Sequence, residues 1–225
     1  MLLTTTRPSR RLFSDHIFFK RINHKKDIYD SSSGVTKFGL LSRQETRKIR
    51  IYPNFLLCLQ HLKQNTMKFD IVDLTEFSGR AAKIYSILPE KDSLTLLDHF
   101  FDDNKDYYLE LKEIAAKLIT MGKYTGCRPQ FFKEYEGAPG DGVVALYYKQ
   151  MRLYCLRYDR SCIFVGSGGV KPPGIAAYQD YPPLDAKATE MKKIAASINK
   201  AIKEKDLMIQ DDGTLIKTDY LELEI

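Results

Sequence analysis

The hydrophobic period of the chain changes near Gly122, and this change limits the folds that the chain can adopt. Before that glycine, apolar residues recur every three or four positions, which is the spacing of one helix face. After it they alternate or form short continuous runs, which is typical of strands. Separate blocks of helices and strands predict an α+β domain, in which helices pack on one face of a small antiparallel sheet and the other face stays free to bind.

The block before Gly122 predicts one strand followed by three helices. The strand is expected at Lys68–Leu74, where apolar residues face both ways. The first helix is expected across residues 77–88. The second takes Ser93 as its N-cap and breaks at Asp102, and the third carries an apolar face that ends at Gly122. The apolar faces make this block the predicted helical layer of the domain.

The block after Gly122 predicts a sheet and one long helix. Cys162–Val165 is wholly apolar, so we expect it in the middle of the sheet. Gly166–Tyr181 is interpreted as a loop, and Asp185–Lys205 as an amphipathic helix. Leu221–Ile225 alternates apolar and acidic residues, which favours a half-exposed edge strand. The expected strands of the sheet are Phe131–Tyr135, Val143–Tyr148, Met151–Tyr158 and Cys162–Val165.

The basic character of the chain comes from its first third. The net charge is +6, but residues 1–66 hold 13 Lys/Arg and 4 Asp/Glu, which makes them +9 and residues 67–225 −3. No helical or strand-like hydrophobic period is sustained over residues 1–66. We therefore interpret this segment as a disordered extension, or as the result of a start codon assigned too far upstream, with Met67 as the true start. A basic RNA-binding arm and an organelle-targeting peptide are the functional alternatives. The predicted domain spans 67–205, and 206–225 is a tail.

Several classes of function are not expected. No stretch approaches the roughly 18 apolar residues of a membrane span, and the start lacks a secretory signal. The four cysteines show no metal-binding spacing, which favours free thiols in a reducing cytoplasm. His99 is the one histidine after Met67, which argues against triad or metal chemistry. The glycines of Gly166–Lys171 precede Pro172, unlike a phosphate loop, so no cofactor is predicted.

A basic, tyrosine-rich segment is the strongest sign of function. Residues 123–171 hold eight Lys/Arg and four Asp/Glu, a net charge of +4 within a domain that is otherwise acidic. Cations bind phosphates and aromatic rings stack on unpaired bases, so this composition suits RNA. The alternative, that the cations are solvated and the tyrosines pack the sheet, stays open. Arg152 and Arg157 are expected on opposite sheet faces. The candidate RNA-binding residues are Lys149, Arg128 and Tyr154.

Four local patterns follow one another in a meaningful order. Helices end in Met121-Gly122-Lys123. Phe132–Gly137 looks like a strand and turn before an active sheet. Met151–Tyr154 looks like an aromatic–Arg–aliphatic–Tyr strand, and Ile163–Lys171 like an apolar strand running into a glycine and a lysine. In this order the chain from Met67 to about Lys205 resembles the RelE/ParE superfamily of bacterial toxins, in its RelE/HigB-like branch.

The resemblance implies an mRNA-cleaving toxin of a type II toxin–antitoxin system, often acting on the ribosome and neutralised by a cognate antitoxin protein. Its metal-free reaction is attack of the RNA 2′-hydroxyl on the adjacent phosphorus, which gives a cyclic phosphate. Carried over by position, Arg152 is expected to stabilise charge on the phosphate. The alternatives are a non-catalytic RNA-binding or regulatory module on the same fold and a ParE-like gyrase inhibitor. The other candidate catalytic residues are Lys133, Arg157, Lys171, Tyr178 and Tyr181.

Overall fold

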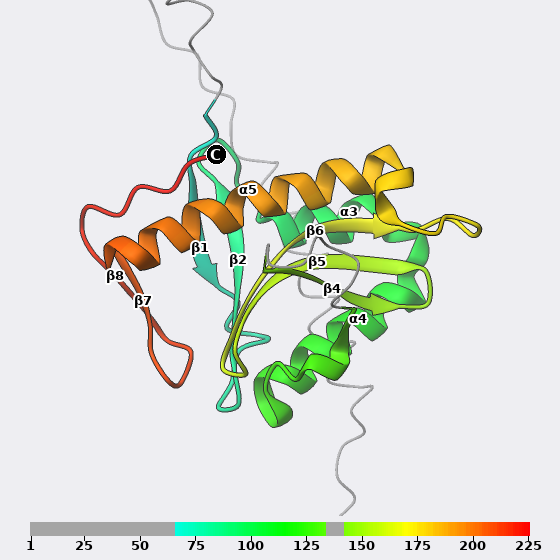
Figure 1. Cartoon of the computed structure of the whole chain (residues 1–225). Coiled ribbons are helices and arrows are strands. Elements are labelled where there is room, and N and C mark those ends of the chain that lie inside the picture. The colour runs from blue at the N-terminus through cyan, green and yellow to red at the C-terminus, as the bar shows by residue number, and fades with distance from the viewer. Residues whose placement is uncertain (1–65, 134–141) are drawn as a thin grey trace, which may run out of the picture. The chain divides into compact units, whose positions relative to one another are not determined.

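The computed structural model describes residues 66–133 and 142–225, and all but the last residue of the predicted extension over 1–66 lies outside them. The described residues confirm an α+β fold, with a six-stranded sheet, a two-stranded sheet and three α-helices (Figure 1). In spatial order the large sheet contains β1 (Phe69–Asp73), β2 (Lys83–Pro89), β6 (Cys162–Val170), β5 (Met151–Tyr158), β4 (Val143–Tyr148) and β3 (Phe132–Lys133). The helices are α3 (Leu96–Asp103), α4 (Tyr108–Thr120) and α5 (Pro182–Glu204), and the small sheet is β7 (Leu207–Ile209) with β8 (Leu215–Lys217).

The large sheet is mixed, and not antiparallel throughout as predicted. β2 and β6 run parallel, with Ile84 opposite Ile163, whereas every other neighbouring pair is antiparallel. A parallel pair needs a long crossover, which here contains the helical block and the strands β3 to β5. The predicted central place of Cys162–Val165 is confirmed, because β6 lies between β2 and β5.

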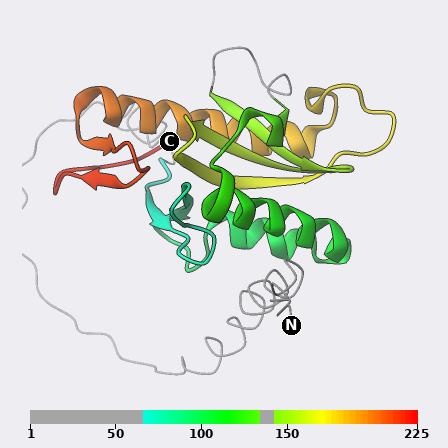
Figure 2. The same cartoon turned by 90° about the horizontal axis from the view of Figure 1, so that it is seen from below.

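Helices cover both faces of the sheet, so the prediction of a free face is wrong. Figure 2 shows α5 on one side of the strands and α4 on the other. One core packs α3 and α4 against residues such as Leu153 and Val165, and a second packs α5 against Leu156 and Phe164. The apolar face of α5 explains the difference, since it has to be removed from water and the second sheet face is equally apolar.

The helix predicted across residues 77–88 is wrong, because the second half of this segment is strand β2 and the first half is not helical. Ile84 and Ile87 have no exposed surface. A strand between two others is covered on both faces and is therefore apolar in a continuous run, and such a run also satisfies helical spacing. The pairing partners of β2, which are Phe69–Asp73 and Cys162–Val165, decide between the two structures.

The other two helices of this block are present, with a different cap on the first. Thr95, and not Ser93, is the N-cap of α3, and it forms a capping box with Asp98. α4 runs into a π-helical turn at Met121–Thr125. Gly122 within that turn is needed for packing, since a Cβ there would lie 1.9 Å from the Phe77 carbonyl oxygen.

Strands β4 and β5 have the predicted bounds and are joined by the predicted tight turn, in which Lys149 has a φ of 49°. β6 is longer than predicted, because it continues to Val170 through residues assigned to a loop. These glycines allow close packing: a Cβ on Gly166 would lie 2.0 Å from Sδ of Met191 in α5.

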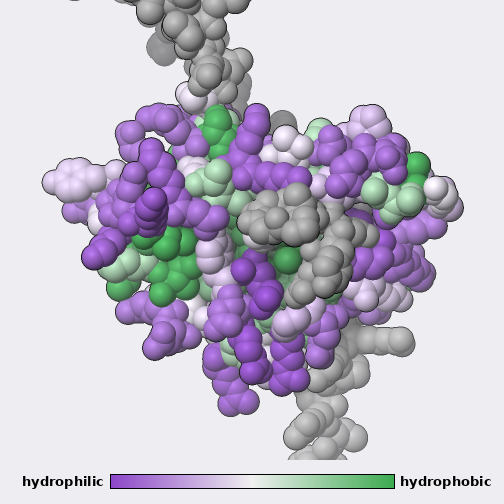
Figure 3. Space-filling model, in the orientation of Figure 1, coloured by the Kyte–Doolittle hydropathy of each residue, from purple (hydrophilic) through white to green (hydrophobic). Residues whose placement is uncertain are grey.

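The tail forms a β7–β8 hairpin that turns at Gly213, whose φ is 87°. Met208 and Ile216 face each other on its exposed side, and Figure 3 shows apolar side chains in this region of the surface. The predicted edge strand at Leu221–Ile225 is reduced to a single bridge between Glu224 and Lys68, outside β1. Within the described ranges, no helix has the length and apolar character needed to cross a bilayer.

Candidate nucleic-acid interface

Three cations surround the ring of Tyr147 where the β4–β5 hairpin ends. The Nζ atoms of Lys117 and Lys133 lie 4.8 and 4.9 Å from the ring centroid, and the guanidinium carbon of Arg152 lies 5.7 Å from it. These are cation–π distances. We call Lys117, Lys133, Arg152 and Tyr147 the cation cluster. Its members come from α4, β3, β5 and β4, so tertiary packing creates it.

Lys117 is the member that sequence reasoning missed. It lies in α4 beside the buried Leu118, and its Nζ donates a hydrogen bond to the Tyr147 carbonyl oxygen. β3 pairs with Ala145 and Leu146 of β4, and the pairing ends before Tyr147. The carbonyl oxygen of Tyr147 therefore accepts from Lys117 and not from β3. Burial lowers the pKa of Lys117, and Glu113 on the same helix acts in the opposite direction. No local pattern marks Lys117, because its partners are distant in sequence.

Lys149 lies beside the cation cluster. Its Nζ lies 5.5 Å from the ring centroid of Tyr148, and the Nζ of Lys117 lies 5.6 Å from the same centroid. Lys149 is exposed and forms an ion pair with Glu110 in α4 at 3.0 Å. The hydrogen bond from Lys149 lowers the pKa of the Glu110 carboxyl. The pair is solvated, so Lys149 can exchange Glu110 for a phosphate at low cost.

We predicted that Arg152 lies on a free sheet face, but its side chain is buried. The side chain is only 5% exposed, and its Nη1 donates to the carbonyl oxygens of Lys149 at 2.8 Å and Met151 at 3.0 Å. These contacts fix the hairpin turn that carries Tyr148 and Lys149. The position of Arg152 within the cation cluster agrees with an electrostatic role, whereas direct contact with a phosphate requires access from the Tyr147 side.

Tyr154 and Tyr178 are brought together, but inside the core. Each is 1% exposed, and their rings meet edge to face with centroids 5.7 Å apart under α5. A base cannot stack on either ring unless α5 moves away, so the fold does not favour the RNA-binding role predicted for Tyr154. The ring of Tyr178 instead has a cation close to it, because the Nζ of Lys192 lies 5.7 Å from the ring centroid.

The remaining predicted residues are dispersed. Lys171 lies at the same end of the sheet as the cation cluster, since its backbone N–H donates to the Gln150 carbonyl oxygen in the hairpin turn. Arg157 lies at the other end of β5, where its charge acts to lower the pKa of the Cys127 thiol. Cys127 belongs to the core on the α4 side of the sheet, so Arg157 lies on that face, as alternation predicts. Arg128 is exposed beyond the π-helical turn, and Tyr181 is half-buried before α5.

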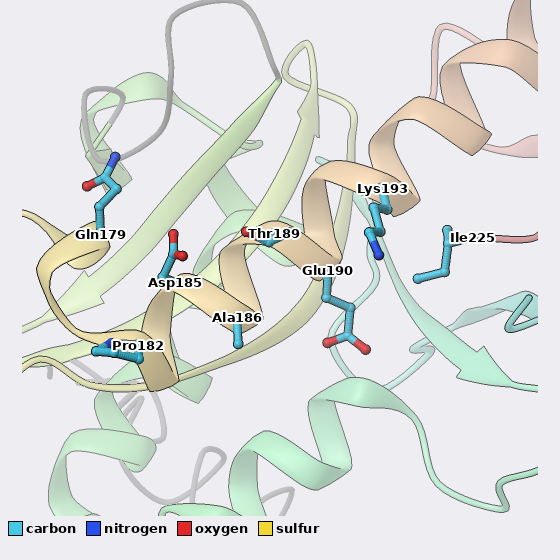
Figure 4. Close-up of a pocket in the computed structure, with 8 residues that line it drawn as sticks. All are labelled: Gln179, Pro182, Asp185, Ala186, Thr189, Glu190, Lys193 and Ile225. Atoms are coloured by element: carbon cyan, nitrogen blue, oxygen red, sulfur yellow. The ribbon is translucent and has the colours of Figure 1, made fainter. Parts of the chain in front are cut away.

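A pocket lies along α5, and Figure 4 shows its lining side chains. Asp185, Glu190 and Lys193 give it more negative than positive charge, which does not suit a phosphate. Glu190 also accepts a hydrogen bond of 3.2 Å from the hydroxyl of Ser167, a buried residue of β6. The described ranges contain no group of three or more His, Cys, Asp or Glu residues that could hold a metal ion.

Comparison with protein-family models, curated proteins and solved structures finds no match to this chain. The chemistry of the cation cluster is therefore the main basis for a function. Positive charge next to partly exposed tyrosine rings, at the end of the sheet where β4 turns into β5, provides electrostatic attraction for phosphate and flat surfaces for bases.

Proposed function

We propose that this chain is a RelE/ParE-like toxin that binds RNA at the cation cluster and cleaves it. The observation that supports this most is the convergence of Lys117, Lys133 and Arg152 on the ring of Tyr147. Each cation lies within 5.7 Å of the ring centroid, so the charges are concentrated at one place, as binding of one or two adjacent phosphates requires. The ring of Tyr148, with Lys149 beside it, offers the neighbouring surface for a base.

The proposed reaction needs no group beyond RNA and the protein. The 2′-oxygen bonds to the adjacent phosphorus, the bond from phosphorus to the 5′-oxygen breaks, and the 2′-hydroxyl proton is replaced by one on the leaving oxygen. The products are a 2′,3′-cyclic phosphate and a 5′-hydroxyl end. The intermediate carries extra negative charge on phosphorus-bound oxygens, and preorganised cations such as Arg152 and Lys133 stabilise it more than they stabilise the substrate.

Binding is tested with the full chain and a fluorescein-labelled, unstructured single-stranded RNA, by anisotropy at several salt concentrations. We expect affinity to fall with salt, and Lys133→Met to weaken binding and to reduce the magnitude of the salt slope by about 0.7, the value for one phosphate contact on a single strand. Lys200→Met is the matched control, because Lys200 is an exposed lysine of α5. Equal affinities of the two variants would contradict an RNA site at the cation cluster.

Cleavage is tested by inducing the full chain in bacteria and by incubating the purified chain with mRNA, with and without ribosomes. We expect growth arrest, loss of translation and fragments that end in cyclic phosphate, all suppressed by a cognate antitoxin. A block in replication that precedes any loss of translation would instead indicate the gyrase-directed alternative.

A non-catalytic RNA-binding module is the second candidate. The two hydrogen bonds from Arg152 to carbonyl oxygens of the hairpin support it, because they give this arginine a structural role that needs no reaction. The same binding assay separates the two candidates: RNA that is retained at the cation cluster but remains intact after long incubation, with ribosomes present, favours the module.

A further inference from the structure

We infer that Lys117 is the catalytic acid of the proposed ribonuclease, and that its ammonium group protonates the 5′-oxygen as it leaves phosphorus. The inference rests on the proposed function and adds a residue that neither the sequence patterns nor the resemblance indicated. It starts from the location of Lys117, whose Nζ is held at the edge of β4 by the Tyr147 carbonyl oxygen and lies close to two tyrosine rings.

The fixed position of Nζ is the first argument. Lys117 belongs to α4, where the next residue, Leu118, is wholly buried. The side chain of Lys117 is half-buried between α4 and β4. A lysine on the surface loses much conformational entropy when it has to hold a reacting group. Lys117 is already ordered, so a phosphate at Lys133 would meet a preorganised proton donor.

The burial of Lys117 among other charged groups is the second argument. Lys133 on β3 and Arg152 on β5 approach the same ring, and Lys149 of the hairpin turn approaches Tyr148. Burial disfavours the ammonium form of Lys117, which makes it a better acid. Glu113 on the same helix opposes this, and Glu110 forms its ion pair with Lys149. The pKa of Lys117 is lowered, because burial outweighs the effect of Glu113.

The proton balance is complete. The 2′-oxygen forms its bond to phosphorus and gives its proton to solvent, while the electron pair of the breaking bond goes to the 5′-oxygen. Lys117 transfers one proton to that oxygen and becomes a neutral amine. The amine then takes up a proton from water, which returns the site to its starting state and leaves the RNA isomerised and cut.

The test compares two substrates in the full chain. The first is an RNA with its ordinary 5′-oxygen at the cleaved position, and the second carries sulfur in place of that oxygen, because a thiolate leaves without a proton. We expect Lys117→Met to slow cleavage of the ordinary RNA by about 10²- to 10⁴-fold, the usual contribution of general acid catalysis. On the sulfur substrate the same variant should cleave at nearly the wild-type rate.

Two further variants separate a catalytic from a structural role. Lys117→Arg keeps the charge and can donate a hydrogen bond, but arginine does not release its proton, so it should cleave the ordinary RNA as slowly as Lys117→Met does. Lys133→Met should slow both substrates equally. A variant of Lys117 that is equally slow on both substrates would overturn the inference while leaving the proposed ribonuclease intact. A wild-type chain that cleaves neither substrate would overturn both.

Discussion

Gly166 in β6 and Met191 in α5 are in direct contact, with no room for a side chain on the glycine. A Cβ at Gly166 would lie 2.0 Å from the Met191 Sδ atom and 2.8 Å from its Cε atom. The helix can therefore approach the strand closely, and this approach closes the sheet face that a binding platform would need. The glycines of β6 thus serve packing rather than phosphate binding.

Substitution at Gly166 tests this packing. We expect Gly166→Ala to lower the free energy of unfolding by about 1–3 kcal/mol, the usual cost of overpacking a core. Gly169→Ala is the matched control in the same strand and should cost less, since its Cβ would meet Leu184 at an ordinary distance of 3.4 Å. Urea denaturation measures both. The combination of Gly166→Ala with Met191→Ala should cost less than the sum of the two single changes, and strict additivity would contradict the contact.

Arg152 and Lys133 should differ in what their loss affects. Arg152→Met removes two hydrogen bonds to hairpin carbonyl oxygens, so we expect it to lower the free energy of unfolding by about 1–3 kcal/mol. Lys133→Met should affect RNA affinity more than stability, because this lysine is only half-buried. Thermal denaturation and RNA anisotropy on both variants check this. Relief of growth arrest by Arg152→Ala is informative only if the variant remains folded.

The cap of α3 provides a test of local structure. Thr95 accepts a hydrogen bond from the backbone N–H of Asp98, whose side chain in turn accepts one from the backbone N–H of Thr95. We expect Thr95→Ala to cost about 0.5–2 kcal/mol of stability, and Ser93→Ala, at an exposed position before the helix, to cost almost nothing. Chemical denaturation of the two variants measures the difference. Equal costs would mean that the helix begins earlier than the structure shows.

Buried thiols and tyrosines should make the fold sensitive to alkali. Burial raises the pKa of Cys127 and of Tyr85 to about 12, and raises the pKa of Cys155, Cys162 and Tyr158 as well. The unfolded chain loses these protons first, so the folded state binds more protons above the ordinary thiol value of 9.0. Stability should therefore be intact below that pH and fall as pH rises towards 12, with each thiol contributing about 1.4 kcal/mol per pH unit.

The alkaline effect is measured by urea denaturation between pH 8 and pH 11 under reducing conditions. Cys127→Ala should flatten the pH dependence, although it lowers stability at neutral pH. The same burial predicts that Cys127, Cys155 and Cys162 resist thiol reagents in the native protein and react after unfolding. Cys58→Ser is the background for this experiment, because Cys58 lies outside the described residues. A flat pH dependence would contradict burial of these groups.

Local pattern was sufficient for part of the fold and of the candidate site. The alternation and short runs in Val143–Tyr148 and Met151–Tyr158 predicted β4 and β5 with their bounds, and the spacing of apolar residues predicted α4 and most of α5. In these elements the residues that decide the structure are close neighbours in the chain. The same composition placed Lys133, Lys149 and Arg152 in one basic segment, and the structure gathers all three at one end of the sheet.

The tertiary structure alone decided what these elements do together. The segment around Ile84 satisfies helical spacing, and only pairing with β1 and β6 makes it a strand. α5 covers one face of the large sheet because both the helix and the sheet bury apolar surface there. A short stretch of sequence does not contain both of these surfaces. Lys117 joins Lys133 and Arg152 because α4 packs beside the edge of β4, across about thirty residues of sequence. Side-chain type is a local property, whereas access and proximity depend on contacts between distant segments.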